Sequence, residues 1–297
     1  MDSVKWRRIV LFVGIVFGAN WGAAGIFALS GLSLGGLPGA VFAAAYMIVP
    51  AIVAIVLARR WGRGLRDYGL RLPRNWYLAL APLIPLLLSV LTVAVALLIG
   101  FGVFDPTGMA IIDRVQVMDE AAAAQTMRER AEEMPVSLPL VILFTAPLAG
   151  FTINGLFALG EELGWRGLLQ QELAPLGFTR SAVLIGLIWG LWHAPMILLG
   201  HNFPENPRLG VLIMTIACVP LGIIMSWLAL KSASVIAAAV AHGTFNAAGG
   251  LTLMVVRGGE TIEVFALGYA GILAMTLVAL VLLALRPRRA GYSAPPS

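Results

Sequence analysis

Long apolar runs separated by short polar connections dominate the chain. A helix needs about 20 mostly apolar residues to cross a hydrocarbon core of about 30 Å. Several runs have this length, and the pattern predicts an all-α fold, a polytopic membrane helix bundle of about eight transmembrane helices. The predicted spans lie near 9–29, 38–58, 77–103, 138–160, 181–200, 209–230, 233–255 and 265–285.

Composition supports a lipid environment. Of the 297 residues, 60% are hydrophobic and only 12% are charged, whereas soluble domains carry about 25% charged residues. The first run is longer than the apolar core of a cleaved signal peptide and more spans follow it, so it is predicted to be the first helix. The single cysteine, Cys218, excludes a framework of intrachain disulfides.

Charge placement tests the number of spans independently. With eight spans, 15 of the 20 basic residues fall on the side that holds both termini, and this bias predicts cytoplasmic termini. That side holds Lys5, Arg7, Arg8, Arg59, Arg60, Arg63, Arg66, Arg71, Arg74, Arg166, Arg180, Lys231, Arg286, Arg288 and Arg289. The other side holds Arg114, Arg128, Arg130, Arg208 and Arg257. Because the clusters alternate with apolar runs, we interpret the net charge of +5 as a topology signal and expect no nucleic-acid partner.

The chain is expected to form one integrated membrane domain with three parts. Residues 1–137 supply three transmembrane helices and an acidic non-cytoplasmic loop, residues 138–255 the core that carries the polar motifs, and residues 256–297 the last helix and a tail. In the loop (104–137), Met118 to Glu133 is predicted to form a helix. The tail from Ala290 to Ser297 is predicted to be disordered.

Charged groups inside membrane spans are costly and therefore call for an explanation. The first cluster, at the end of the fourth span, contains Glu161, Glu162 and Arg166. On a continuous helix Glu162 and Arg166 are four residues apart and are placed to pair. Glu161 lies about 100° away around the axis, with Trp165 as its nearest same-face neighbour, so it is free to face a cavity. A pair of interfacial charges that ends the helix is the alternative.

The other two clusters lie in the fifth and seventh spans. His193 follows Trp189 by one helical turn, so the indole is placed to cover one side of the imidazole. His242 and Asn246 are four apart and project from one face, among small residues that allow close helix approach. Each cluster alone is also compatible with a hydrogen bond that joins two helices. Together, a carboxylate, two imidazoles and a carboxamide are the groups that activate water and stabilise an oxyanion, or form a proton or ion pathway.

The order Glu-Glu-x-x-x-Arg, aromatic-x-x-x-His and His-x-x-x-Asn, each on its own hydrophobic helix, resembles the CPBP family. This family contains the type II CAAX prenyl endopeptidases and the bacterial bacteriocin-immunity (Abi) proteins. The resemblance covers roughly residues 138–255, and the amino-acid sequence of the motifs is similar to that of the bacterial branch. One departure is Trp189, where phenylalanine is commonest in the family; the position keeps an aromatic ring.

The resemblance implies an eight-helix membrane endopeptidase whose cavity opens to the cytoplasm. Carried onto this chain, Glu161 would be the general base, and His193 would help to hold or polarise the water. His242 and Asn246 would stabilise the oxyanion. The supporting residues would be Glu162, Arg166 and Trp189, of which the first two would fix Glu161.

Whether the predicted site uses a metal ion is left open by the sequence. Glu161, His193 and His242 have the donor types of a catalytic zinc site with an open position. The chain lacks His-Glu-x-x-His, the spacing that places two zinc ligands on one turn. We favour a glutamate-dependent mechanism that requires no cofactor, with zinc as the alternative.

Two other functions compete with an intramembrane endopeptidase. One is a non-catalytic immunity or scaffold protein that keeps the motifs. The other is a proton-coupled transporter, which is disfavoured because the first half has almost no buried polar residue besides Asn20. The expected partners are the bilayer and a peptide or membrane-protein substrate, in a multi-pass protein of the cell membrane. Cys218 has no histidine in its span and is rejected as a nucleophile. His201 is placed on the non-cytoplasmic side, away from the cavity.

Overall fold

The computed structural model describes residues 4–73, 75–117, 121–133 and 136–292. Helices make up about three-quarters of this part of the chain, and its two strands have two residues each, which confirms the predicted all-α class. The first half contains α1 (Trp6–Leu29), α2 (Gly36–Arg60), η1 (Leu65–Tyr68), α3 (Tyr77–Leu80), α4 (Leu83–Ile99), β1 (Val103–Phe104), α5 (Ala110–Val117), α6 (Ala121–Glu132) and α7 (Leu138–Phe151). The second half contains α8 (Ile153–Glu162), η2 (Leu163–Leu169), α9 (Gln170–Leu173), η3 (Ala174–Leu176), α10 (Phe178–Trp192), α11 (Ala194–Leu198), α12 (Pro207–Ser232), α13 (Val235–Ala248), α14 (Leu251–Val255), β2 (Val256–Arg257), α15 (Thr261–Val264) and α16 (Tyr269–Ala284).

Fewer helices than expected are long and apolar enough to cross a membrane. Within the described residues there are six, or up to seven if α7 and the helical run after it, which bend by 53° at Thr152, form one span. By this criterion of length and composition the count is close to the predicted number of about eight. The expected span 233–255 is divided into α13, of 14 residues, and α14, of five. At 1.5 Å per residue, α13 is about 21 Å long, short of the hydrocarbon thickness of about 30 Å.

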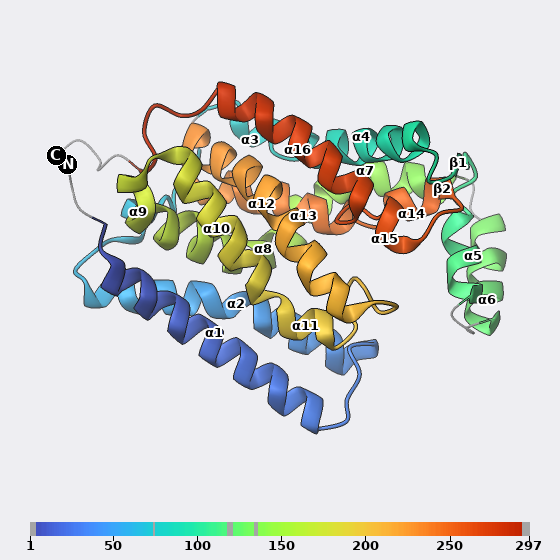
Figure 1. The fold of residues 1–297 in the computed structure, drawn as a ribbon, viewed down its shortest axis with the longest axis horizontal. Helices are drawn as coiled ribbons and strands as arrows, with labels where there is room; N and C mark the ends of the chain where they lie inside the picture. Colours follow the sequence, from blue (N-terminus) through green and yellow to red (C-terminus); the bar gives the residue numbers. More distant parts are fainter. Residues whose placement is uncertain (1–3, 74, 118–120, 134–135, 293–297) are drawn as a thin grey trace.

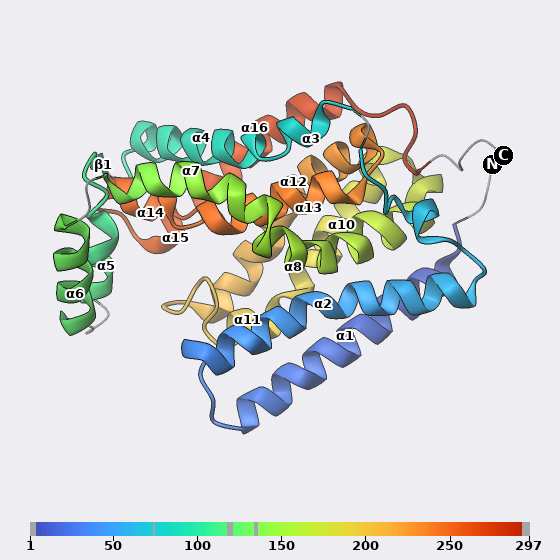
Figure 2. The same ribbon diagram turned by 180° about the vertical axis from the view of Figure 1, so that it is seen from behind.

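The short helix α13 lies inside the bundle. It packs against α7, α8, α12 and α4, and nearly all of its side chains from Val235 to Phe245 are buried. In Figures 1 and 2, α1 and α2 lie along one side of the molecule and α3, α4 and α16 along the other, with α8, α10, α12 and α13 between them. The helices that carry the polar motifs are therefore the inner helices of the bundle.

Glycines allow the inner helices to approach closely. A Cβ at Gly243 of α13 would meet the backbone of Asn154 and Gly155 in α8. A Cβ at Gly160 of α8 would likewise meet the backbone of Met47 in α2. Small residues at such contacts are characteristic of membrane helix pairs. They bring the side chains at the end of α8 within reach of those on α13.

The segment after α4 forms a small subdomain at one end of the bundle. Its strands β1 and β2 pair antiparallel, Val103 opposite Arg257 and Phe104 opposite Val256, a detail the sequence did not predict. Helices α5 and α6 stand beside this pair. The predicted loop helix is confirmed as α6; Met118 to Glu120 lie outside the described residues.

Part of the tail predicted to be disordered is folded. The Tyr292 hydroxyl donates to the Arg166 carbonyl at 2.7 Å, and the Tyr292 amide donates to Gln171 Oε1 at 2.8 Å. The Gln170 side chain donates to the Ala290 carbonyl at 2.7 Å. Ala290–Tyr292 therefore attach to η2 and α9, because buried carbonyls and amides there need partners. The remaining tail positions, 293–297, lie outside the described residues.

Candidate active site

Two of the three helices that carry the motifs are irregular at the motif, whereas α13 is continuous through His242 and Asn246. After Glu162, α8 continues as a π-helix, η2, in which all seven residues are buried. The helix α10 ends at Trp192, where His193 caps it. The separate helix α11 begins at Ala194, with Pro195, which has no N–H, in its first turn. Single-turn π-helices occur frequently at functional sites. These breaks place Glu161, Glu162 and His193 at helix ends rather than along continuous faces.

The Glu162 carboxylate joins two of the motifs. Its Oε1 accepts from Arg166 Nη1 at 2.8 Å and lies 2.9 Å from His242 Nδ1. All three side chains are buried. The predicted Glu162–Arg166 pair is thus present, and His242 from the third motif contacts the same carboxylate oxygen. The Arg166 guanidinium also lies over the Trp189 ring, 4.1 Å from its centroid, a favourable cation–π contact.

Glu161 is held by the fifth-span motif instead. The indole Nε1 of Trp189 donates to Glu161 Oε2 at 2.7 Å, which leaves Oε1 of that carboxylate toward the pocket. Trp165, the same-face neighbour expected for Glu161, packs against Phe12 and Trp192. The two adjacent carboxylates therefore have separate partners, as the sequence predicted.

Both imidazoles are oriented through Nδ1. His193 Nδ1 lies 2.8 Å from the Trp189 carbonyl, an obligate acceptor, so this nitrogen carries the proton. His242 Nδ1 faces the Glu162 carboxylate in the same way. Trp189 packs between the two rings, with its centroid 5.6 Å from that of His193 and 5.2 Å from that of His242. Each histidine is left with Nε2 for a ligand in the pocket.

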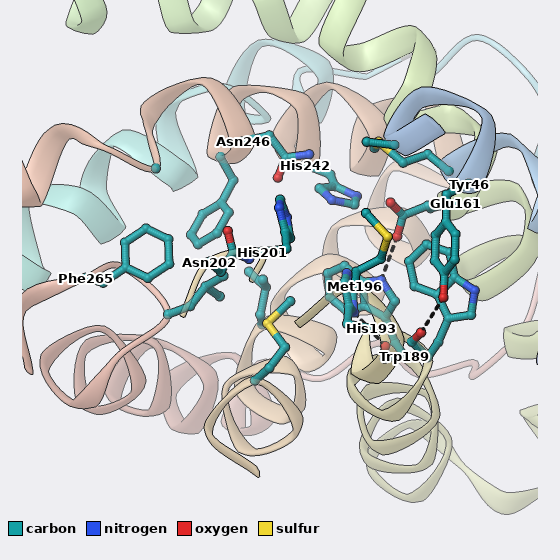
Figure 3. A pocket seen from close by; sticks show the side chains of 18 residues that line it. Tyr46, Glu161, Trp189, His193, Met196, His201, Asn202, His242, Asn246 and Phe265 are labelled. Atoms are coloured by element: carbon teal, nitrogen blue, oxygen red, sulfur yellow. Dashed lines mark hydrogen bonds between the residues drawn. The ribbon is translucent and has the colours of Figure 1, made fainter. Parts of the chain in front are cut away.

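These groups line one pocket of about 250 Å³. In Figure 3, Glu161, Trp189 and Tyr46 lie at one end of the pocket, and Asn202 and Phe265 lie at the other. His242 and Asn246 come from α13 and His193 from the end of α10. All four side chains predicted to be catalytic are thus brought together, whereas Glu162 and Arg166 lie behind them. Their catalytic roles remain predictions.

The sequence missed the contribution of the first two helices. The Tyr46 hydroxyl donates to the Trp192 carbonyl at 2.9 Å, and Trp192 Nε1 donates to Asn20 Oδ1 at 3.0 Å. The Asn20 amide in turn donates to the Tyr46 carbonyl at 3.0 Å. This network fixes α1 and α2 against the residue that precedes His193. Asn20, a polar residue in an apolar run, was the available signal.

The expectation that His201 lies away from the cavity is wrong. His201 and Asn202 line the same pocket as Glu161. The reason is the break at His193: α11 is only five residues long, and the chain then turns at Asn202, whose φ is 60°. A continuous helix to residue 200 would have carried His201 away from the site. Cys218 is free and buried in α12, as expected for a packing residue.

The proposed zinc ligands do not form a ligand set in this structure. Among the described residues, no group of three or more His, Cys, Asp or Glu side chains is close enough to hold a metal ion. One Glu161 oxygen is also engaged by Trp189. Because the donors do not meet, we derive no chemical step through a metal.

The fold and the site define a class of protein, a multi-pass helical membrane protein with carboxylates, imidazoles and a carboxamide around a pocket between its inner helices. Residues 135–248 match the family model described as type II CAAX prenyl endopeptidase Rce1-like. The family resemblance inferred from the three motifs is therefore confirmed for this segment.

A curated relative points the same way. The CAAX prenyl protease 2 of Methanococcus maripaludis is 29% identical over an alignment that covers 38% of this chain. The chain spans about half the length of this relative, 51%. The matched family segment contains all four residues predicted to be catalytic, and it does not include α1, α2, α5, α6, α16 or the tail.

Proposed function

We propose that this protein is a membrane-embedded endopeptidase that hydrolyses a peptide bond with water activated by Glu161 and His193. The observation that supports the proposal is the convergence of Glu161, His193 and His242 on one pocket, with each side chain oriented by its own hydrogen bond. A general base and an oxyanion site held in fixed orientation are what peptide hydrolysis requires. The similarity of residues 135–248 to CAAX endopeptidases supports the same reaction.

The attacking water is bound between Glu161 and His193. Glu161 Oε1 takes a proton from the water, and the Nε2 lone pair of His193 accepts its second hydrogen, since Nδ1–H is occupied by the Trp189 carbonyl. The oxygen then bonds to the scissile carbonyl carbon, and the carbonyl π electrons move to its oxygen. The Trp189 N–H steadies the Glu161 carboxylate through the other oxygen.

The oxyanion is bound by the α13 motif. Asn246 supplies an amide N–H, and His242 in its imidazolium form supplies Nε2–H while its Nδ1–H donates to Glu162. Glu162 balances the charge of that imidazolium, and Arg166 in turn balances Glu162. When the carbon–nitrogen bond breaks, Glu161 returns its proton to the leaving amine. Atoms and charge balance without a cofactor, so we propose a metal-free mechanism with zinc as the alternative for the experiment.

The experiment is cleavage of quenched peptides by the purified protein in detergent. The panel includes a prenylated CAAX peptide, and each reaction is run with and without a chelator. Glu161→Gln is expected to lower the rate by about 10²–10⁴-fold, the usual effect of a general base. Glu172→Gln is the matched control, because Glu172 is also a buried carboxylate but pairs with Arg8 and Tyr68 outside the pocket.

Three results would count against the proposal. Full activity of Glu161→Gln would contradict the role of that carboxylate. Loss of activity with the chelator, restored by added zinc, would contradict the metal-free mechanism and support a zinc-dependent one. A cellular phenotype that survives combined substitution of Glu161, His193 and His242 would support the non-catalytic immunity or scaffold alternative.

A further inference from the structure

Three residues from three different helices form a closed ring of hydrogen bonds beside the candidate active site. The Tyr46 hydroxyl of α2 donates to the Trp192 carbonyl of α10 at 2.9 Å. The Trp192 indole Nε1 donates to Asn20 Oδ1 of α1 at 3.0 Å, and the Asn20 amide donates to the Tyr46 carbonyl at 3.0 Å. All three residues are at most 3% exposed. Because buried polar groups are costly to leave without partners, each member of the ring holds the other two in place.

The ring of hydrogen bonds acts at the break between α10 and α11. The helix α10 ends at Trp192, and His193 lies between it and α11, which begins at Ala194. The Trp192 carbonyl at this break accepts from Tyr46 and also, at 3.3 Å, from the indole Nε1 of Trp21. The Trp192 side chain packs nearly perpendicular to the His193 imidazole, with 4.8 Å between the centroids and 80° between the planes. The backbone and the side chain of the residue before His193 are therefore both fixed by α1 and α2.

Tyr46 also lines the pocket, where its hydroxyl is already engaged as a donor. It lies at the same end of the pocket as Glu161, as Figure 3 shows. A tyrosine hydroxyl has one proton, and here the Trp192 carbonyl accepts it. In this arrangement the hydroxyl oxygen can only accept further hydrogen bonds. It can neither protonate a leaving amine nor stabilise an oxyanion, so any role of Tyr46 in hydrolysis is exerted through the residue that it holds.

We propose that Tyr46 is a positioning residue for peptide hydrolysis that acts on His193 through the Trp192 carbonyl. The inference rests on the proposed function, in which His193 Nε2 accepts a hydrogen bond from the attacking water. The bond from His193 Nδ1 to the Trp189 carbonyl sets the rotation of the imidazole, and the bond from Tyr46 fixes the backbone from which the imidazole projects. Tyr46 lies outside the matched segment 135–248, so α2 supplies part of the geometry of the site.

Removal of the Tyr46 hydroxyl tests this role. Tyr46→Phe retains the ring, whose centroid lies 4.6 Å from that of Trp192, and removes only the donor. In peptide cleavage by the purified protein in detergent, kcat is expected to fall by about tenfold with KM little changed, the order expected for one lost hydrogen bond. Tyr68→Phe is the matched control, because Tyr68 is also buried and its hydroxyl bonds to Glu172 outside the pocket. Its kcat is expected to remain close to that of the wild type.

A double-variant cycle separates positioning from general destabilisation. If Tyr46 acts through His193, Tyr46→Phe lowers kcat in the wild type but has no further effect in a His193→Gln background. The same fold reduction in both backgrounds would show a merely structural role and would overturn the inference. An unchanged kcat of Tyr46→Phe in the wild-type background would overturn it as well. Where His193→Gln is too slow to measure, a spectroscopic measurement decides.

That measurement follows the histidines directly and needs no proteolysis. The chain has three histidines, so NMR spectra of the protein with ¹⁵N-labelled histidine can be assigned by single substitutions. Tyr46→Phe is expected to shift the His193 ring signals, since the imidazole lies beside the indole that the substitution releases. Asn20→Ala, which opens the ring of hydrogen bonds at α1, is expected to shift the same signals. His193 signals that change in neither variant, or that shift equally in Tyr68→Phe, would overturn the proposal.

The two measurements also separate this inference from the proposed function. If no peptide is cleaved but Tyr46→Phe shifts the His193 signals, the endopeptidase is wrong and the role of Tyr46 in orienting that imidazole stands. If Glu161→Gln abolishes cleavage while Tyr46→Phe changes neither kcat nor the His193 signals, the endopeptidase stands and the role of Tyr46 is wrong.

Discussion

His242 Nδ1 lies 2.9 Å from Glu162 Oε1, although the two residues are 80 positions apart on α13 and α8. The same carboxylate oxygen accepts from Arg166, four residues later. A single buried carboxylate therefore fixes both His242 and the start of the π-helix. In the proposed mechanism Glu162 would be a positioning residue that acts through His242.

Substitution of Glu162 by Gln is expected to reduce both stability and turnover. Removal of one partner of a buried ion pair costs about 3–5 kcal/mol, because the remaining charge is left without compensation. Arg166 is fully buried, so the cost falls on the folded state. Thermal unfolding in detergent checks the stability. A double variant, Glu162→Gln with Arg166→Met, should recover stability but not turnover; recovery of both would contradict the positioning role.

The Trp189→Phe substitution tests the hydrogen bond to Glu161. It removes the Nε1–H donor, which lies 2.7 Å from the carboxylate, and retains a ring between the two histidines. A hydrogen bond to a charged group contributes about 1.5–3 kcal/mol, so kcat is expected to fall by about tenfold or more with little change in KM. Trp165→Phe is the matched control, because its buried indole N–H has no partner among the described residues. Equal effects of both substitutions would refute the assignment.

The docked tail is expected to stabilise the protein. Tyr292→Phe removes a 2.7 Å hydrogen bond to the Arg166 carbonyl and should lower the free energy of unfolding by about 1 kcal/mol. Tyr292→Ala also removes a buried ring that packs on Gly69, and the expected loss is about 3–5 kcal/mol. Thermal unfolding measures both. Tyr269→Phe, at a 39% exposed position, should change little, and no difference among the three variants would show that the tail is not held.

Close helix packing makes Gly243 sensitive. An alanine Cβ there would meet the α8 backbone at Asn154 and Gly155, and overpacking of this kind costs about 1–3 kcal/mol. Because His242 is the preceding residue, Gly243→Ala should also lower turnover. Gly18→Ala in α1 is the control, since nothing lies within 4 Å of an added Cβ. A Gly243→Ala variant as stable and active as the control would contradict the close approach.

The ion pair between Asp105 and Arg257 should respond to low pH. Burial opposes ionisation of Asp105, but hydrogen bonds from Thr107 and Arg257 outweigh it and lower the pKa of this carboxyl below its ordinary value. The unfolded state then binds a proton more readily than the folded state. The stabilisation is therefore complete above the ordinary pKa of an aspartate, about 3.9, and is lost as pH falls through the lower folded value.

The measurement is thermal unfolding from pH 7 to pH 3 for the wild type and for Asp105→Asn. The variant should be less stable at pH 7, and its stability should fall less between pH 4 and pH 3. A parallel fall in both proteins would show that Asp105 does not contribute to this acid response.

The sequence by itself determined the helical membrane class, because apolar runs of about 20 residues have few alternatives to lipid. It also determined the motif residues and the Glu162–Arg166 pair, since an i,i+4 spacing on a helix is a local relationship. The tertiary structure decided what depends on breaks and long-range contacts. The turn after His193 brings His201 into the pocket, and the close approach of α8 and α13 joins Glu162 to His242. The expected span 233–255 is divided into the two short helices α13 and α14.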